Sequence, residues 1–214
     1  MIILSFKTYR EATGEAALRL CQIVKNVREK TGVRIIPVVQ ATDIYRIKKE
    51  VGIEVWAQHI DPIDPGRHMG WISAYAVKQA GATGVVINHS EHKLSDDLVK
   101  KTLEKAKEYD LENIVIGQTV EDVVKFDSFD PDFISYEKEE FISSGIPLLT
   151  SEKENIKKLV SVLRHPLIIG AGISKPEDIK QALDLGAKGV ILSSAFVLSD
   201  NPEKTLFDLA QVFL

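Results

Sequence analysis

Three side chains suited to acid–base chemistry stand just after short apolar runs in this sequence. They are Lys7, His89 and Glu137. A cation and an imidazole can stabilise negative charge that develops on a carbonyl oxygen, while a carboxylate accepts a proton from the adjacent carbon. We therefore expect these three residues to form one catalytic site for proton transfer on a carbonyl compound.

Two small turns suggest where a substrate would be anchored. Gly170-Ala-Gly172 and Ser193-Ser194 each follow an apolar run and precede a helical pattern. Such turns expose backbone N–H groups at helix starts, which is a common way to bind phosphate. The predicted substrate is a small phosphorylated carbonyl compound.

Eight apolar, mostly β-branched runs must position these residues. Near-continuous apolar runs of this length are typical of parallel strands that are buried on both faces. The predicted strands are Ile2–Phe6, Arg34–Val39, Glu54–Ala57, Gly84–Ile87, Asn113–Ile116, Phe133–Tyr136, Leu167–Ile169 and Gly189–Leu192.

Helical patterns separate the strands. Apolar residues recur every three or four positions in Glu15–Lys30, and Ser95 is expected to cap another helix. Ser174-Lys-Pro-Glu177 reads as a capping box, and Asn201-Pro202 as a further helix start. This alternation predicts an α/β fold, and eight strands favour a closed β/α barrel over an open doubly wound sheet. With no linker apparent, residues 1–214 are expected to form one domain whose site lies at the carboxyl ends of the strands.

The composition narrows the function classes. The chain is 44% hydrophobic and 27% charged with a net charge of -4, as expected of a soluble globular protein without a broad nucleic-acid or membrane surface. Its one cysteine, Cys21, cannot form an internal disulfide and is expected to be buried. The five histidines lack metal-ligand spacing, so no metal is expected. A cytoplasmic location fits these features.

At these same positions the chain resembles the triosephosphate isomerase family, in the short form typical of archaea. The matching segments occur in family order along nearly the whole chain. They are Phe6-Lys-Thr-Tyr9, Ala57-Gln-His-Ile-Asp-Pro62, Asn88-His-Ser-Glu91, Tyr136-Glu137, Ser144-Gly-Ile-Pro147, Gly170-Ala-Gly-Ile-Ser174 and Gly189-Val-Ile-Leu-Ser-Ser194.

The resemblance implies a (β/α)8 TIM barrel that interconverts D-glyceraldehyde 3-phosphate and dihydroxyacetone phosphate through an enediolate, without a cofactor, in glycolysis and gluconeogenesis. Lys7 would hold the phosphate and polarise the carbonyl, a neutral His89 would act as the electrophile, and Glu137 would be the base. Further substrate contacts would come from Ser5, Ile142, Gly172, Ser193 and Ser194, with Ile142 in a closing lid.

Several positions depart from the family pattern. Ser5 replaces a usual asparagine, Lys138 replaces the proline that follows the base, Ser143-Ser144 replaces Gly-Thr, and Ala195 replaces glycine. These changes leave two alternatives open. One is a sugar-phosphate-binding paralogue that is non-catalytic or altered in specificity. The other is a different phosphate-binding barrel, for instance one acting on a prenyl or indole glycerol phosphate, which the turns alone would fit.

A long loop follows His59 and contains the apolar residues Met69 and Trp71. Such a loop is more easily explained as an interface element than as free coil. In the resembled family it reaches into a neighbouring subunit, which implies a homodimer or a homotetramer. We expect His59 to be structural and His68 to lie at the interface.

Overall fold

Parallel strands form a closed barrel at the centre of the protein. The computed structural model describes residues 1–141 and 148–214, and within them eight strands pair in sequence order, with β8 returning to β1. Every predicted strand is present, which confirms the predicted fold class. The strands are β1 (Ile2–Ser5), β2 (Ile35–Val39), β3 (Trp56–Ala57), β4 (Gly84–Ile87), β5 (Glu112–Gly117), β6 (Phe133–Tyr136), β7 (Leu167–Ile169) and β8 (Gly189–Leu192).

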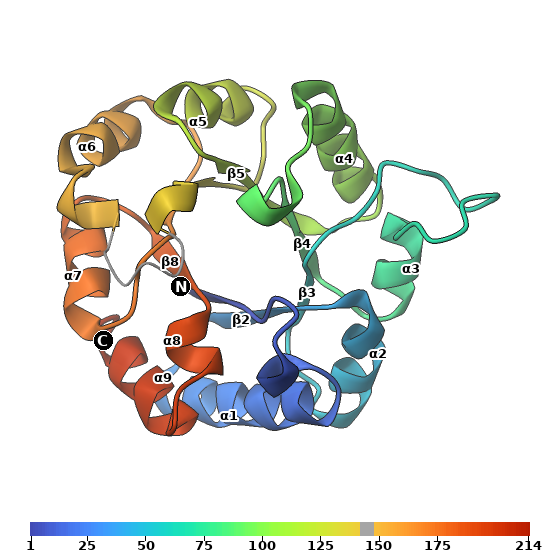
Figure 1. Ribbon diagram of the computed structural model, residues 1–214, viewed down its shortest axis with the longest axis horizontal. Coiled ribbons are helices and arrows are strands. Elements are labelled where there is room, and N and C mark those ends of the chain that lie inside the picture. Colours follow the sequence, from blue (N-terminus) through green and yellow to red (C-terminus); the bar gives the residue numbers. More distant parts are fainter. Residues whose placement is uncertain (142–147) are drawn as a thin grey trace.

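Helices surround the barrel in a ring (Figure 1). None of the described helices is long and apolar enough to cross a membrane. The α-helices are α1 (Glu15–Thr31), α2 (Ala41–Glu50), α3 (Ala74–Gln79), α4 (Asp96–Glu108), α5 (Val120–Asp127), α6 (Lys153–Val162), α7 (Pro176–Asp184), α8 (Ser194–Val197) and α9 (Pro202–Gln211). Short 3-10 turns are η1 (Arg10–Ala12), η2 (Ser90–His92), η3 (Glu139–Phe141) and η4 (Leu148–Thr150).

Helix caps show where local sequence determines the fold. The Ser95 side chain accepts the Leu98 N–H at the start of α4, as predicted. The capping box predicted for Ser174-Lys-Pro-Glu177 is wrong in detail. The carboxylate that accepts the Ser174 and Lys175 N–H groups belongs to Asp178, one residue further on. The N-cap is Lys175 and not Ser174, so the third helical position is Asp178, which is buried, and not Glu177, which is exposed.

The core has two layers, one inside the barrel and one between strands and helices. Alternate strand residues fill the interior, as expected when parallel strands tilt around a closed barrel. Trp56 occupies part of this interior beside Gly84, where an added Cβ would lie 2.4 Å from the indole ring. The interior cluster is Ile3, Ile36, Val38, Trp56, Val86, Ile114, Ile116, Ile168 and Ile191. Cys21 is buried in the outer layer, as predicted.

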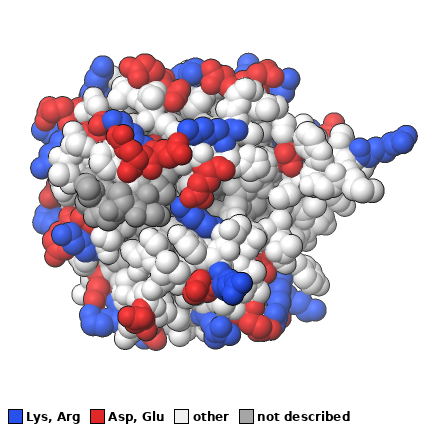
Figure 2. Space-filling model, in the orientation of Figure 1, with Lys and Arg blue, Asp and Glu red and all other residues white. Residues whose placement is uncertain are grey.

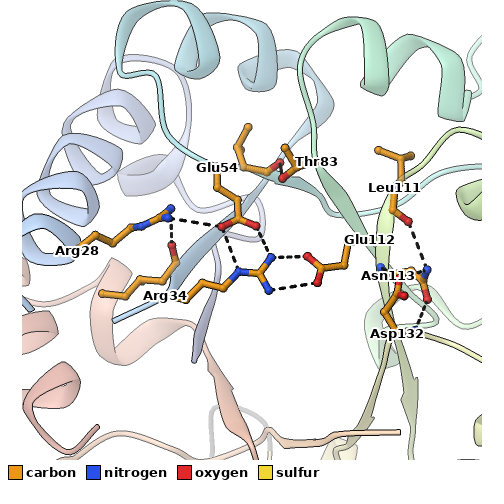
Figure 3. A network of polar contacts seen from close by, with 10 residues as sticks. Arg28, Arg34, Glu54, Thr83, Leu111, Glu112, Asn113 and Asp132 are labelled. Atoms are coloured by element: carbon orange, nitrogen blue, oxygen red, sulfur yellow. Dashed lines mark hydrogen bonds and ion pairs between the residues drawn. The ribbon is translucent and has the colours of Figure 1, made fainter. Parts of the chain in front are cut away.

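An arginine joins three strand starts at the end of the barrel opposite the site (Figure 3). Arg34 precedes β2 and pairs with Glu54, before β3, through contacts of 2.5 and 3.2 Å. Its guanidinium also pairs with Glu112 at the start of β5. The two carboxylates raise the pKa of Arg34, so the guanidinium stays charged. Bidentate pairing of this kind fixes the relative orientation of the arginine and the carboxylate, as well as contributing energy.

We expect Arg34→Ala to lower the free energy of unfolding by roughly 1–3 kcal/mol, because it leaves Glu112 without its cation and Glu54 with only the longer 3.6 Å contact to Arg28. Urea unfolding of the purified protein measures the change. Arg46→Ala is the matched control, since Arg46 pairs with Glu15 and Glu50 at the surface and should cost under about 1 kcal/mol. Equal losses in the two variants would contradict the structural role of Arg34.

Candidate active site

The residues predicted to form the site lie around one cavity of about 280 Å³ at the carboxyl ends of the strands. The structure brings together all the predicted residues that it describes, and Ile142 lies outside the described residues. On this face acidic and basic side chains are interspersed, without a broad patch of one sign (Figure 2). A dianionic ligand would therefore be held by local groups. The lining includes Ser5, Lys7, His89, Glu137, Gly172, Ser193 and Ser194.

His89 follows β4, and its ring is oriented by the backbone of Glu91, two residues further on. The Nδ1 atom accepts the Glu91 N–H at 3.2 Å, at the start of η2. A nitrogen that accepts a hydrogen bond carries no proton, so the ring proton is on Nε2. That atom lies 3.8 Å from the Glu137 carboxylate. In this geometry the Nε2 side of the ring faces the Glu137 carboxylate.

Glu137 is buried at the end of β6, with 3% of its surface exposed. Burial raises the pKa of its carboxyl group, and the nearby His89 and the Ser135 hydroxyl partly offset that rise. The Ser135 hydroxyl donates to Oε1 at 3.1 Å. A Cβ at position 170 would lie 2.3 Å from the Glu137 carboxyl carbon, so only glycine leaves room for this side chain. These features make Glu137 a base whose proton affinity is greater than that of an exposed carboxylate.

Lys7 follows β1, and its ammonium group lies 2.5 Å from a Glu91 carboxylate oxygen. The lysine side chain is 13% exposed, whereas that of Glu91 is 54% exposed. Sequence reasoning did not identify this partner or Ser135. Glu91 belongs to the segment Asn88-His-Ser-Glu91, which resembles the family. Its position in the sequence gave no indication that its side chain would contact Lys7, because the two residues follow different strands, β4 and β1. Ser135 lies two residues before Glu137, and this strand spacing, which places both side chains on one face, was the signal that could have found it.

The turns after β7 and β8 form the other side of the cavity. Ala171 and Gly172 both have left-handed backbone conformations, with φ of 69° and 76°. The Ser193 hydroxyl is buried and has no hydrogen-bond partner in the described part of the chain. Small residues, a helix start and an unpaired hydroxyl leave space and donors for an anionic group.

A second cavity of about 330 Å³ adjoins the first beside β2 and β3. His59 borders it, bonded to Asp61 at 3.2 Å and stacked on His92 at 4.2 Å. Burial lowers the pKa of His59, which favours the neutral ring. The described residues contain no group of three or more side chains that could hold a metal ion. The structural role of His59 stays a prediction.

Comparisons with known proteins identify the family. The family model for triosephosphate isomerase matches residues 1–211. A triosephosphate isomerase of Methanobacterium bryantii is 43% identical over 98% of this chain and 95% of its own length. One from Methanothermus fervidus is 39% identical, over 98% and 96% respectively.

A solved structure shows the same fold. The crystal structure of triosephosphate isomerase from Bartonella henselae superposes with a TM-score of 0.79 at 18% identity, covering 99% of this chain and 98% of that one. The archaeal relatives named above match this chain in length as well as in sequence, as the short form predicts. On the family match and these relatives, the chain belongs to the triosephosphate isomerase family.

Proposed function

We propose that this protein interconverts D-glyceraldehyde 3-phosphate and dihydroxyacetone phosphate without a cofactor. The observation that carries the proposal is the buried Glu137 carboxylate, 3.8 Å from His89 Nε2 in a cavity that Lys7 also lines. Membership of the family supports the same reaction. The altered residues Ser5 and Lys138 leave this arrangement intact, and no observation favours a non-catalytic paralogue or a barrel of other specificity.

The proposed roles follow from the positions of the groups. Glu137 removes a proton from the carbon next to the carbonyl, and the electron pair moves onto the carbonyl oxygen to form an enediolate. The Nε2–H of His89 donates to that oxygen, and the Lys7 ammonium stabilises its charge and the phosphate. His89 Nε2 then gives its proton to the former carbonyl oxygen and takes the hydroxyl proton from the neighbouring oxygen, while Glu137 returns its proton to the former carbonyl carbon, so that the new carbonyl forms on the neighbouring carbon. We assign the remaining phosphate contacts to Ser5, Gly172, Ser193 and Ser194.

The purified protein should turn over glyceraldehyde 3-phosphate in an assay coupled to a dehydrogenase. Glu137→Gln should lower kcat by roughly a thousandfold or more, because the amide cannot accept the proton. Phosphoglycolate binding by this variant, measured by calorimetry, should persist and show that the cavity is intact. An inactive wild-type protein would contradict the proposed reaction, and a fully active variant would contradict the role of Glu137.

We expect Ser135→Ala to shift the acidic limb of the kcat/KM profile to higher pH. The Ser135 hydroxyl stabilises ionised Glu137, so its loss raises the pKa of that carboxyl group further. The base must be ionised to work, so activity would be lost at a higher pH than in the wild type as the solution is acidified. Rates measured from acid to neutral pH test this, and the neutral plateau is the internal reference. Unchanged or acid-shifted limbs would contradict it.

The wider context is proposed on the same basis. The reaction would serve glycolysis and gluconeogenesis in the cytoplasm. Cofactor independence rests on the chemistry, because the substrate carbonyl itself acidifies the carbon from which Glu137 removes a proton. Residues 1–214 would form a single domain, since the closed barrel uses β1 near the beginning of the chain and β8 near its end.

We also propose that the protein self-associates, as a homodimer or a homotetramer. The loop between β3 and α3 projects away from the barrel (Figure 1). Its residues Met69 and Trp71 are 99% and 56% exposed, which is unusual for large apolar side chains on one loop. His68 lies against Trp71, with ring centroids 6.2 Å apart. Covering these side chains with a second copy would remove apolar surface from water.

Light scattering should therefore report two or four times the mass of one chain. The double variant Met69→Asp, Trp71→Asp should shift the mass toward a single chain at micromolar concentration, since it places charges in an apolar contact. Leu214→Asp, which alters an exposed apolar residue elsewhere, is the control and should leave the mass unchanged. A monomeric wild-type protein would contradict self-association.

A further inference from the structure

A buried carboxylate outside the barrel contacts both chain neighbours of Glu137. Glu152 lies at the N-cap of α6, and its side chain is 10% exposed. Its Oε1 accepts a hydrogen bond from the Lys138 ammonium group at 2.6 Å, and its Oε2 accepts one from the Tyr136 hydroxyl at 2.8 Å. The residue before the expected base and the residue after it are therefore held by one carboxylate.

Three donors converge on the Glu152 carboxylate. The third is the Asn155 side-chain amide, which donates to Oε2 at 2.6 Å. Burial alone would raise the pKa of the Glu152 carboxyl group, but the hydrogen bonds from the three donors outweigh it and hold that pKa below its usual range. Burial and the Glu152 carboxylate also raise the pKa of Tyr136, so the phenol keeps its proton and donates. Glu152 is thus an ionised acceptor with a fixed place.

The alternation of side chains along β6 explains how Glu152 can act on Glu137 without touching it. Tyr136 belongs to the core layer between strands and helices, whereas Ser135 and Glu137 meet on the other face of the strand. Successive side chains of an extended chain point to opposite faces, so Lys138 lies on the same side as Tyr136. Holding both outer side chains keeps the backbone between them from rotating, and that rotation would swing the Glu137 side chain.

Backbone pairing restrains the chain only as far as the base. The Glu137 N–H donates to the Gly117 carbonyl at 3.1 Å, which continues the β5–β6 pairing one residue beyond β6. The chain then turns into η3, where the Phe141 N–H donates to the Lys138 carbonyl at 3.1 Å. Lys138 therefore lies where the chain leaves the sheet, and its contact with Glu152 fixes the backbone at that point.

We propose that Glu152 is a positioning residue for Glu137. By holding Tyr136 and Lys138 from outside the barrel, it keeps the Glu137 carboxylate 3.8 Å from His89 Nε2. Without Glu152, the end of β6 can rotate, and the carboxylate moves away from the carbon that gives up its proton. The phosphate end of the cavity is formed by other strands and stays unchanged. The inference rests on the proposed isomerase reaction, in which Glu137 is the base.

Glu152→Gln tests the role, because it keeps the shape of the side chain but loses the charge and one of the two accepting oxygens. It should lower kcat roughly ten- to a hundredfold, as expected when a reacting group is displaced by about 1 Å. KM should stay within about twofold of the wild-type value, because the phosphate contacts are kept. The inhibition constant of glycerol 3-phosphate, which carries the phosphate but no carbonyl, should likewise be unchanged.

Glu154→Gln is the matched control. Glu154 lies on the same helix, but its carboxylate pairs with Lys157 at the surface, where it is 86% exposed. The same substitution there should leave kcat within about twofold of the wild type.

Further variants separate positioning from general loss of structure. Lys138→Met removes one of the two restraints and should lower kcat several-fold, whereas Lys138→Arg keeps the cation and should largely preserve kcat. In a Glu137→Gln background, Glu152→Gln should cause no further loss of the residual kcat, because Glu152 acts through Glu137.

Losses that multiply in the double variant would overturn the proposal. So would a Glu152→Gln kcat within about twofold of the wild type, or a fall in kcat matched by weaker glycerol 3-phosphate binding. If Glu152→Gln does not fold, as judged by thermal melting, Lys138→Met decides the question in the same assays. An inactive wild-type protein refutes the proposed reaction instead. Crystal structures of the wild type and Glu152→Gln then still test the link, because the Glu137 carboxylate should lie farther from His89 Nε2 in the variant, and equal distances would overturn it.

Discussion

The pairing of β8 with β1 is the contact on which the site depends. It aligns Ile2 with Val190 and Leu4 with Leu192, joining the two ends of the chain. This register brings Lys7, which follows β1, beside the Ser193-Ser194 turn, which follows β8. In an open sheet of the same strand order, these groups would lie at opposite edges. Closure of the barrel thus places the lysine and the expected phosphate site around one cavity, without a long connection between them.

Burying the Glu137 carboxylate beside that cavity carries an electrostatic cost that other interactions must offset. Removing a carboxylate such as that of Glu137 from water costs several kcal/mol, and a hydrogen bond to a charged group returns only about 1.5–3 kcal/mol. His89 and Lys7 also favour the ionised carboxyl group, and burial of the apolar barrel interior stabilises the fold that holds it. A reactive carboxylate can stay buried because the rest of the barrel is stable enough to hold it there.

The sequence predicted the fold better than it predicted the contacts of the site. β4 and β6 have the bounds expected from their apolar runs, and α4 begins where Ser95 indicated, because these features depend on residues close together in the chain. The contact between Glu91 and Lys7 could not be predicted in this way, because these residues follow β4 and β1 and only closure of the barrel brings them together. The cap of α7 was misassigned by one residue because the N-cap is Lys175 and not Ser174, which moves the capping carboxylate to Asp178.

Gly170 illustrates how a site can depend on a residue with no side chain. A Cβ there would lie 2.3 Å from the Glu137 carboxyl carbon, so β7 contributes space where a neighbouring strand contributes the reactive group. The two positions are far apart in the chain, yet a side chain at 170 would displace the Glu137 carboxyl group from its place beside His89. The position of this carboxylate is therefore set by the neighbouring strand end as much as by its own.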